Sequence, residues 1–214
     1  MVKIKICGIT TLDDGRAALE SGADMLGFNF YRPSPRFIAP ETARTIIDSL
    51  RQQNETQPFK SVGIFVNEPI EQLVRAVSIS GVDSVQLHGD ESPEYCSSVK
   101  SNLGGIAVVK ALRVGPNFEP GDAANYQVDA IMLDAFHNQL RGGTGLVIDW
   151  HMARAVSAVV DRLFLSGGLS PDNVAEAIAA VQPYAVDACS SLESVPGRKD
   201  PTRMNSFVRA ARNS

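Results

Sequence analysis

Short apolar runs alternate with longer segments of helical period along most of the chain. The runs are rich in β-branched residues, as buried parallel strands are, and they cover residues 3–7, 24–30, 61–66, 83–88, 106–113, 129–134, 162–166 and 184–189. The segments between them carry helix start signals such as Pro40-Glu41 and stop signals such as Ser80-Gly81. Eight strands joined by helical crossovers predict a single (β/α)8 TIM barrel, with an open doubly wound α/β sheet as the alternative.

The composition is that of one globular domain that binds a small molecule. The chain has 214 residues, 44% of them hydrophobic, so residues 1–214 can bury one large core. A net charge of -4 without a dense basic run argues against nucleic acid as a partner. No apolar segment is as long as a signal core or a membrane span, and three cysteines are an odd number for disulfides. We therefore expect a cytoplasmic protein with reduced thiols and no membrane contact.

Alternation of side chains along the first strand places a cysteine inside the barrel. Ile4 and Ile6 share one face, which should meet the helices, and Lys5 and Cys7 share the other. Because Cys7 ends the strand, it should lie at the C-terminal mouth, where barrels of this kind hold their active sites. The structural alternative is that Cys7 only packs, since cysteine is among the most often buried residue types.

Other strands bring polar residues toward the same mouth. The pairs that share a face are Gln86 with His88, Lys110 with Leu112, Met132 with Asp134, and Asp187 with Cys189. A buried charge without a partner is costly, so we expect Lys5 and Lys110 to pair with carboxylates such as Asp134 or Asp187. The structural alternatives are that His88 is a rim residue and that Asp134 braces the loop that follows it.

The seventh and eighth strands end in small residues that suit an anion. Gly167 and Gly168 follow the seventh strand, and Ser190 and Ser191 follow the eighth. Small residues let backbone N–H groups approach a phosphate, and the segments that follow can direct helix N-termini at it. A phosphate site opposite Cys7 suggests a phosphosugar enzyme.

Two long loops, at residues 31–39 and 135–148, should lie over the barrel mouth. In the first, the stiff frame Pro33-Ser34-Pro35 would hold Arg36 for bidentate capture of a carboxylate; the alternative is a solvated loop charge. In the second, Gly142-Gly143-Thr144-Gly145 is a weak signal on its own. The sequence has neither metal-ligand spacing nor a dinucleotide glycine fingerprint, so we expect no metal and no nicotinamide cofactor.

Seven blocks follow one another along nearly the whole chain. They are Lys5-Ile6-Cys7-Gly8-Ile9-Thr10; Gly27-Phe28-Asn29-Phe30-Tyr31 with Ser34-Pro35-Arg36; Val62-Gly63-Ile64-Phe65-Val66-Asn67; Gln86-Leu87-His88-Gly89-Asp90-Glu91; Gly142-Gly143-Thr144-Gly145 with Asp149-Trp150; Leu165-Ser166-Gly167-Gly168-Leu169; and Pro196-Gly197 with Lys199-Asp200. Together they resemble the phosphoribosylanthranilate isomerase family of tryptophan biosynthesis. Seven blocks in order are far more specific than any one of them.

The resemblance implies a cofactor-free Amadori rearrangement of N-(5-phosphoribosyl)anthranilate to the carboxyphenylamino-deoxyribulose phosphate by a monomer or homodimer. It implies that Cys7 is the general base, that Asp134 is the general acid and that Arg36 holds the anthranilate carboxylate. We expect Lys5 or nearby N–H groups to lower the pKa of Cys7 enough for it to act near neutral pH. The further substrate-binding residues that we expect are His88, Gly143, Gly167, Gly168, Asp187, Ser190 and Ser191.

Two positions depart from the family pattern, and two rival functions stay open. Leu146 stands where many members carry lysine, and Ser191 stands in a glycine position, where a positive φ would strain serine. One rival is the isomerase of histidine biosynthesis, which should carry a carboxylate in place of Cys7 and two phosphate sites. The other is a non-catalytic barrel that binds a phosphorylated metabolite or a partner protein. Such a binder has no need of an acid and a base together.

Overall fold

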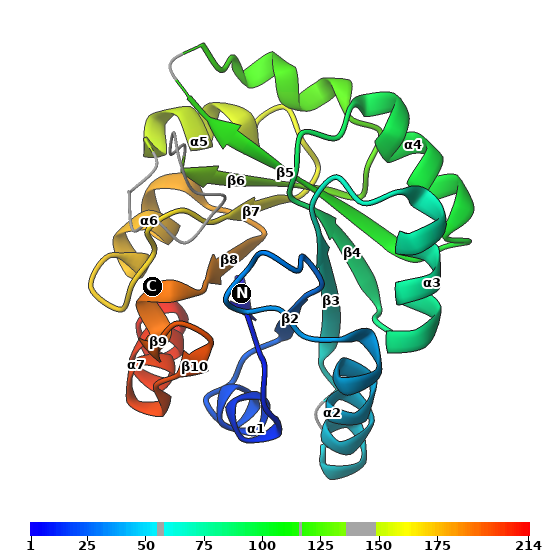
Figure 1. Cartoon of the computed structure of the whole chain (residues 1–214). Coiled ribbons are helices and arrows are strands. Elements are labelled where there is room, and N and C mark those ends of the chain that lie inside the picture. Colours follow the sequence, from blue (N-terminus) through cyan, green and yellow to red (C-terminus); the bar gives the residue numbers. More distant parts are fainter. Residues whose placement is uncertain (55–57, 116, 136–148) are drawn as a thin grey trace.

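The computed structural model describes residues 1–54, 58–115, 117–135 and 149–214. Eight strands form a sheet that closes on itself in sequence order, β1 to β8, and each neighbouring pair is parallel. The strands lie at the centre of the molecule and the helices surround them (Figure 1). This closed barrel confirms the predicted fold class and excludes the open doubly wound sheet.

The strands begin and end within one residue of the predicted apolar runs. Their bounds are β1 Lys3–Cys7, β2 Met25–Asn29, β3 Lys60–Phe65, β4 Ser84–Leu87, β5 Ala107–Val114, β6 Ala130–Ala135, β7 Leu163–Leu165 and β8 Ala185–Ala188. A short antiparallel pair, β9 Glu193–Val195 and β10 Arg198–Lys199, follows β8. This pair was not predicted, because runs of two or three residues carry too little periodicity to be recognised.

The helices lie between the strands at the positions that their start signals indicate. Their bounds are α1 Leu12–Glu20, α2 Pro40–Gln53, α3 Ile70–Ser80, α4 Pro93–Asn102, α5 Trp150–Ser157, α6 Val174–Val181 and α7 Pro201–Arg212, with 3-10 helices η1 Pro120–Asn125 and η2 Ser190–Leu192. Thr11 caps α1 and Ser92 caps α4, each by accepting a hydrogen bond from a backbone N–H of the first turn. Gly81 ends α3 at a φ of 65°, a left-handed conformation that glycine adopts without strain.

Buried side chains form two layers, one inside the barrel and one beneath the helices. The inner cluster consists of Met25, Val62, Val109, Ala111, Ala130, Met132, Phe164 and Ala185. The larger outer cluster includes Ile4 and Ile6 of β1, as the alternation along that strand predicts. The inner cluster fills the barrel below the mouth, so polar side chains collect above it.

The prediction for β5 was wrong about the face on which Lys110 lies. Val109 and Ala111 belong to the inner cluster, so their neighbour Lys110 points outward, beneath the helices. Its Nζ donates a hydrogen bond to Oε2 of Glu91 at 2.6 Å and another to the carbonyl of Gly89 at 2.9 Å. Lys110 does pair with a carboxylate, as predicted, but that carboxylate is Glu91 and not Asp134 or Asp187. Strand β5 is apolar on both faces, so alternation alone could not assign its lysine.

Removing Lys110 should destabilise the protein strongly. Both side chains of the Lys110–Glu91 pair are only 2% exposed, so Lys110→Ala would leave a buried carboxylate without its cation. We expect the free energy of unfolding to fall by about 3–5 kcal/mol. The control is Lys100→Ala, which removes an ion pair to Asp129. The Lys100 side chain is 43% exposed, so its removal should lower the free energy of unfolding by about 1 kcal/mol or less. Equal midpoints for the two variants in urea unfolding would contradict this interpretation.

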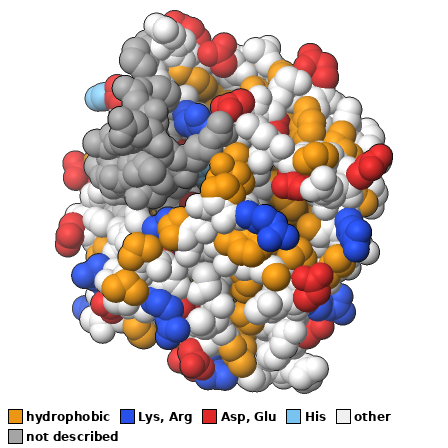
Figure 2. Space-filling view, viewed as in Figure 1, with side chains coloured by type: hydrophobic (Ala, Val, Ile, Leu, Met, Phe, Trp, Pro, Cys, Tyr) orange, Lys and Arg blue, Asp and Glu red, His pale blue; other side chains and the backbone are white. Residues whose placement is uncertain are grey.

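Charged side chains of both signs are interspersed over the face shown in Figure 2. Such a mixture does not concentrate one sign of charge on the visible surface. Among the helices that the structure describes, none is both long and apolar enough to cross a membrane.

Candidate active site

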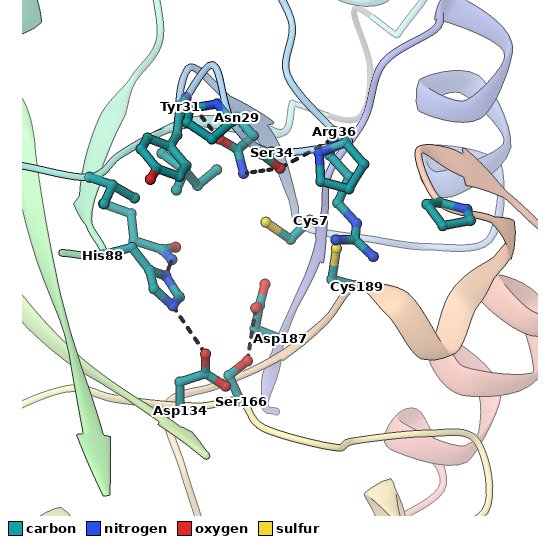
Figure 3. Close-up of a pocket in the computed structure, with 16 residues that line it drawn as sticks. Cys7, Asn29, Tyr31, Ser34, Arg36, His88, Asp134, Ser166, Asp187 and Cys189 are labelled. Atoms are coloured by element: carbon teal, nitrogen blue, oxygen red, sulfur yellow. Dashed lines mark hydrogen bonds and ion pairs between the residues drawn. The ribbon is translucent and has the colours of Figure 1, made fainter. Parts of the chain in front are cut away.

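A cavity of about 520 Å³ opens at the C-terminal ends of the strands. Its lining includes Cys7 of β1, His88 after β4, Asp134 of β6 and Asp187 of β8, and the side chain of Arg36 reaches it from the loop after β2 (Figure 3). The four side chains other than Arg36 lie where alternation along the strands predicts, at the mouth and on the inner face of the barrel. The structure thus brings residues from four strands and one loop together in one polar cavity above the apolar barrel core.

Lys5 and Asp187 form a buried ion pair at the floor of this cavity. Lys5 Nζ donates a hydrogen bond to Oδ1 of Asp187 at 2.7 Å, and Ser166 Oγ donates one to Oδ2 at 3.1 Å. Burial opposes the charge of Lys5, but Asp187 and Cys7 more than offset this and raise its pKa. The prediction that Lys5 pairs with a carboxylate such as Asp187 is confirmed.

Cys7 is not activated by Lys5 in the way that we expected. The neighbouring Cys189 and burial raise the pKa of the Cys7 thiol well above its ordinary value, and the charge of Lys5 only partly offsets them. Conversely, Cys7, together with Lys199 and Arg36, lowers the pKa of Cys189 to about 7 in spite of burial. These surroundings therefore favour the protonated form of Cys7 and ease the ionisation of Cys189.

Asp134 lies across the cavity from Cys7 and is positioned by His88 (Figure 3). His88 Nε2 is 3.0 Å from Oδ2 of Asp134, and the other ring nitrogen, Nδ1, is 2.6 Å from the amide nitrogen of Gln86. The Asp134 side chain is 6% exposed and that of His88 is 14% exposed. A buried chain of three polar groups therefore fixes the direction in which the Asp134 carboxyl points.

Arg36 is held in a fixed orientation by a carboxylate of the chain itself. Its Nε and Nη2 donate hydrogen bonds to the two carboxylate oxygens of Glu193, at 2.8 and 2.7 Å. Lys199 Nζ also donates to Glu193, at 3.1 Å. Burial opposes ionisation of Glu193, but Arg36 and Lys199 together hold its pKa below the ordinary value. The bidentate geometry expected of Arg36 is present, and its partner is the carboxylate of Glu193.

Glu193 and Lys199 were not predicted as site residues. They belong to β9 and β10, and Glu193 follows the 3-10 turn after β8, so alternation along a long strand could not place either one. The only sequence signal was the Pro196-Gly197 block with Lys199-Asp200, which carries no chemistry by itself. Cys189 was placed on the inner face with Asp187, but its contact with Cys7 was not foreseen.

The loops after β7 and β8 lie side by side at one edge of the mouth. Ser191 Oγ donates a hydrogen bond to the carbonyl of Leu169, which ties the two loops together. Gly167 and Gly168 have positive φ values of 84° and 72°, a conformation in which any larger residue is disfavoured. The helix expected to begin near Ser191 is present as η2, a single 3-10 turn.

The suspected backbone strain at Ser191 is not found. Among the described residues, the non-glycine positions with positive φ are Asn67 and Gln182, and Ser191 is not one of them. A serine therefore fits this turn without the strain that a left-handed conformation would cause. Two further residues of the sequence predictions, Gly143 and Leu146, lie outside the described residues.

Within residues 1–54, 58–115, 117–135 and 149–214, no group of three or more His, Cys, Asp or Glu side chains could hold a metal ion. Besides amides and hydroxyls, the cavity offers two thiols, two carboxylates, an imidazole and a guanidinium. Thiols, carboxylates and imidazole can accept or donate protons, whereas a guanidinium binds anions. The arrangement suits proton transfer on a ligand that carries negative charge.

Comparisons with known proteins agree with one another. The family model for N-(5'phosphoribosyl)anthranilate (PRA) isomerase matches residues 4–210. An N-(5'-phosphoribosyl)anthranilate isomerase of Citrifermentans bemidjiense is 46% identical over 213 residues, which cover 99% of this chain and 98% of that one. The phosphoribosyl anthranilate isomerase structure from Thermotoga maritima is 38% identical, covers both chains fully and has a TM-score of 0.88. A second solved isomerase, 38% identical with a TM-score of 0.84 over both full chains, is in complex with reduced 1-(o-carboxyphenylamino)-1-deoxyribulose 5-phosphate.

Proposed function

The chain belongs to the N-(5'-phosphoribosyl)anthranilate isomerase family, and from this membership we infer how its cavity performs the family's reaction. It is an isomerase of tryptophan biosynthesis that converts N-(5-phosphoribosyl)anthranilate to 1-(2-carboxyphenylamino)-1-deoxyribulose 5-phosphate. The observation that carries the mechanism is the position of Cys7 and Asp134, which face each other across the cavity from β1 and β6. This arrangement supports one acid and one base on opposite sides of a sugar.

Asp134 is proposed as the general acid. Its protonated carboxyl would transfer a proton to the ring oxygen of the ribose, so that the ring opens to an iminium ion. His88, 3.0 Å from Asp134, keeps the carboxyl directed into the cavity. Because both side chains are largely buried, little water can compete with the ring oxygen for that proton.

Cys7 is proposed as the general base. Its thiolate would remove the proton from C2 of the iminium ion and give an enolamine, which tautomerises to the ketone of the product. The surroundings of Cys7 favour its protonated form and lower the pKa of the neighbouring Cys189 to about 7, so passing the Cys7 proton to an ionised Cys189 would generate the base. The nearby cations Lys5, Lys199 and Arg36 can stabilise the single negative charge that the two thiols share.

The two ends of the substrate would be held on opposite sides of this pair. We propose that Arg36 releases Glu193 and binds the anthranilate carboxylate in its place. Glu193 would then keep its contact with Lys199. We propose that backbone N–H groups of Gly167, Gly168, Ser190 and Ser191 bind the phosphate, with η2 directed at it. Asp187 and His88 would line the ribose between these ends, and Gly143 is proposed as a further contact. Binding at both ends turns remote binding energy into orientation of the reacting carbon.

Replacing Arg36 should weaken substrate binding more than it slows the chemical step. We expect Arg36→Met to raise KM by about tenfold or more, because one charge-assisted bidentate contact is lost, while kcat changes less. The control is Arg32→Met, which removes an exposed arginine of the same loop that lies over the Phe37 ring. A KM for Arg36→Met equal to that of Arg32→Met would exclude Arg36 as the carboxylate-binding group.

A side chain at Gly168 should block the phosphate site. Gly168→Val puts a β-branched residue at a φ of 72° and fills space that the phosphate needs, so KM should rise by about tenfold or more. The control is Gly121→Val, at a glycine whose added Cβ would meet no atom within 4 Å. Unchanged KM in a folded Gly168→Val protein would place the phosphate elsewhere.

The activity itself is tested by a fluorescence assay. The unstable substrate is generated in place, and the protein is added while anthranilate fluorescence is followed. Loss of fluorescence that depends on the amount of protein is the expected result. A signal no faster than the uncatalysed background would favour the non-catalytic barrel instead.

The remaining properties are proposals that follow from the sequence and the family. We propose that residues 1–214 act as one domain, as a monomer or homodimer, and that the enzyme works in the cytoplasm without a cofactor. The cavity has the guanidinium of Arg36 in its lining, which suits a substrate with anionic ends.

A further inference from the structure

Cys189 is a second thiol beside the proposed base, and its part in the proposed mechanism is limited to taking up the proton of Cys7. Its Sγ lies 3.7 Å from Lys199 Nζ and 3.9 Å from Glu193 Oε1, and its side chain lines the cavity together with Cys7. Both cysteines are partly exposed, whereas the third cysteine, Cys96, is fully buried on the inner face of α4. The cavity therefore gives a small oxidant access to two thiols at once.

The strand register places these two thiols within bonding reach. β1 and β8 are parallel neighbours with Lys5 opposite Asp187 and Ile6 opposite Ala188, so Cys7 and Cys189 occupy the next positions. Neighbouring strands lie about 4.7–4.9 Å apart, within the range of about 4.4–6.8 Å that Cα atoms joined by a disulfide span. The side chains point the same way, since both follow inward-facing residues by two positions, and Cys189 Sγ lies against Gly8, the residue after Cys7, where an added Cβ would be only 3.0 Å from it.

We propose that Cys7 and Cys189 form a reversible intramolecular disulfide when the protein meets a peroxide, and that this bond switches the isomerase off. The Cys189 thiolate attacks one peroxide oxygen, the O–O bond breaks, and Cys189 becomes a sulfenic acid while the other oxygen leaves as hydroxide, which takes the proton of Cys7 and becomes water. The Cys7 thiolate then attacks the Cys189 sulfur, the S–O bond breaks, and the hydroxide that leaves takes a proton from solvent and becomes a second water. The peroxide gains two electrons and the two thiols lose them.

The charges around Cys189 favour it as the sulfur that is oxidised first. The neighbouring Cys7, with Lys199 and Arg36 facing Cys189 from β10 and from the loop after β2, brings the pKa of Cys189 down to about 7, against the opposing effects of burial and Glu193. A thiolate is the nucleophilic form, so Cys189 can react with a peroxide near neutral pH. The surroundings of Cys7 favour its protonated form, which leaves Cys7 as the resolving thiol. The loss of activity rests on the proposed role of Cys7 as base, whereas formation of the disulfide does not.

The test exposes the reduced full-length protein to hydrogen peroxide and follows two readouts, non-reducing peptide mapping and isomerase activity. We expect a Cys7–Cys189 cross-linked peptide, a fall in activity of about a hundredfold or more at full oxidation, and recovery of both with dithiothreitol. Cys96→Ala should behave in the same way. Cys189→Ser should form no such cross-link, and the activity of this variant after peroxide treatment is compared with its activity before treatment.

Each outcome bears on one part of the proposal. Absence of the cross-linked peptide in the native protein at peroxide levels that inactivate it would overturn the disulfide. Inactivation of Cys189→Ser as fast and as reversibly as the native protein would overturn Cys189 as the site. A cross-link that leaves turnover unchanged would support the disulfide but refute the switch, together with Cys7 as the base.

Discussion

Cys7→Ala should lower kcat by about a hundredfold to ten-thousandfold, the range that a well-placed general base contributes. The methyl group cannot take the proton from C2, whereas the binding groups Arg36 and the loops after β7 and β8 stay in place. KM should therefore change little, and circular dichroism and the unfolding midpoint should stay near those of the native protein. The measurement is steady-state turnover with substrate generated in place.

A second cysteine provides the matched control. Cys96→Ala removes a thiol on the buried face of α4, outside the cavity lining, so it can lower stability but should keep kcat within a few-fold. Near-normal turnover of Cys7→Ala would exclude the thiol as the base. A loss of similar size in both variants would indicate a general effect on the fold instead.

Asp134→Asn should be comparably damaging, by about two orders of magnitude or more in kcat, because an amide cannot act as the general acid. The substitution keeps the size of the side chain and one oxygen near His88 Nε2, so the cavity should keep its shape. The control is Asp172→Asn, at an exposed aspartate before α6 that lies outside the cavity lining. If kcat of Asp134→Asn stayed near that of Asp172→Asn, another residue would have to open the ribose ring.

The fold was predictable from the sequence because each unit carries its own local signals. The apolar runs mark strands buried on both faces, and caps such as Thr11 and Ser92 mark where helices begin. Alternation along the strand then placed Cys7, His88, Asp134 and Asp187 at the mouth, since inward and outward positions differ in polarity there. The prediction of a closed barrel rested on the number of strands, because eight is the number that a TIM barrel requires.

The wrong or missing predictions concern residues about which those local signals give no information. In β5 both faces are apolar, so nothing in the pattern says that Lys110 lies outside, paired with Glu91. The contact of Arg36 with Glu193 depends on a short hairpin after β8, which no periodicity marks. The effect of Cys189 on the pKa of Cys7 arises between neighbouring strands at opposite ends of the sequence.

The most direct test of the account is a crystal structure of this protein with reduced 1-(o-carboxyphenylamino)-1-deoxyribulose 5-phosphate bound. The account predicts phosphate between Gly168 and Ser191, the carboxylate on Arg36 in place of Glu193, and C2 of the sugar within about 3–3.5 Å of Cys7 Sγ, with Asp134 on the opposite side. A ligand bound in the reverse direction, with its phosphate on Arg36, or one whose C2 faces away from Cys7, would contradict it.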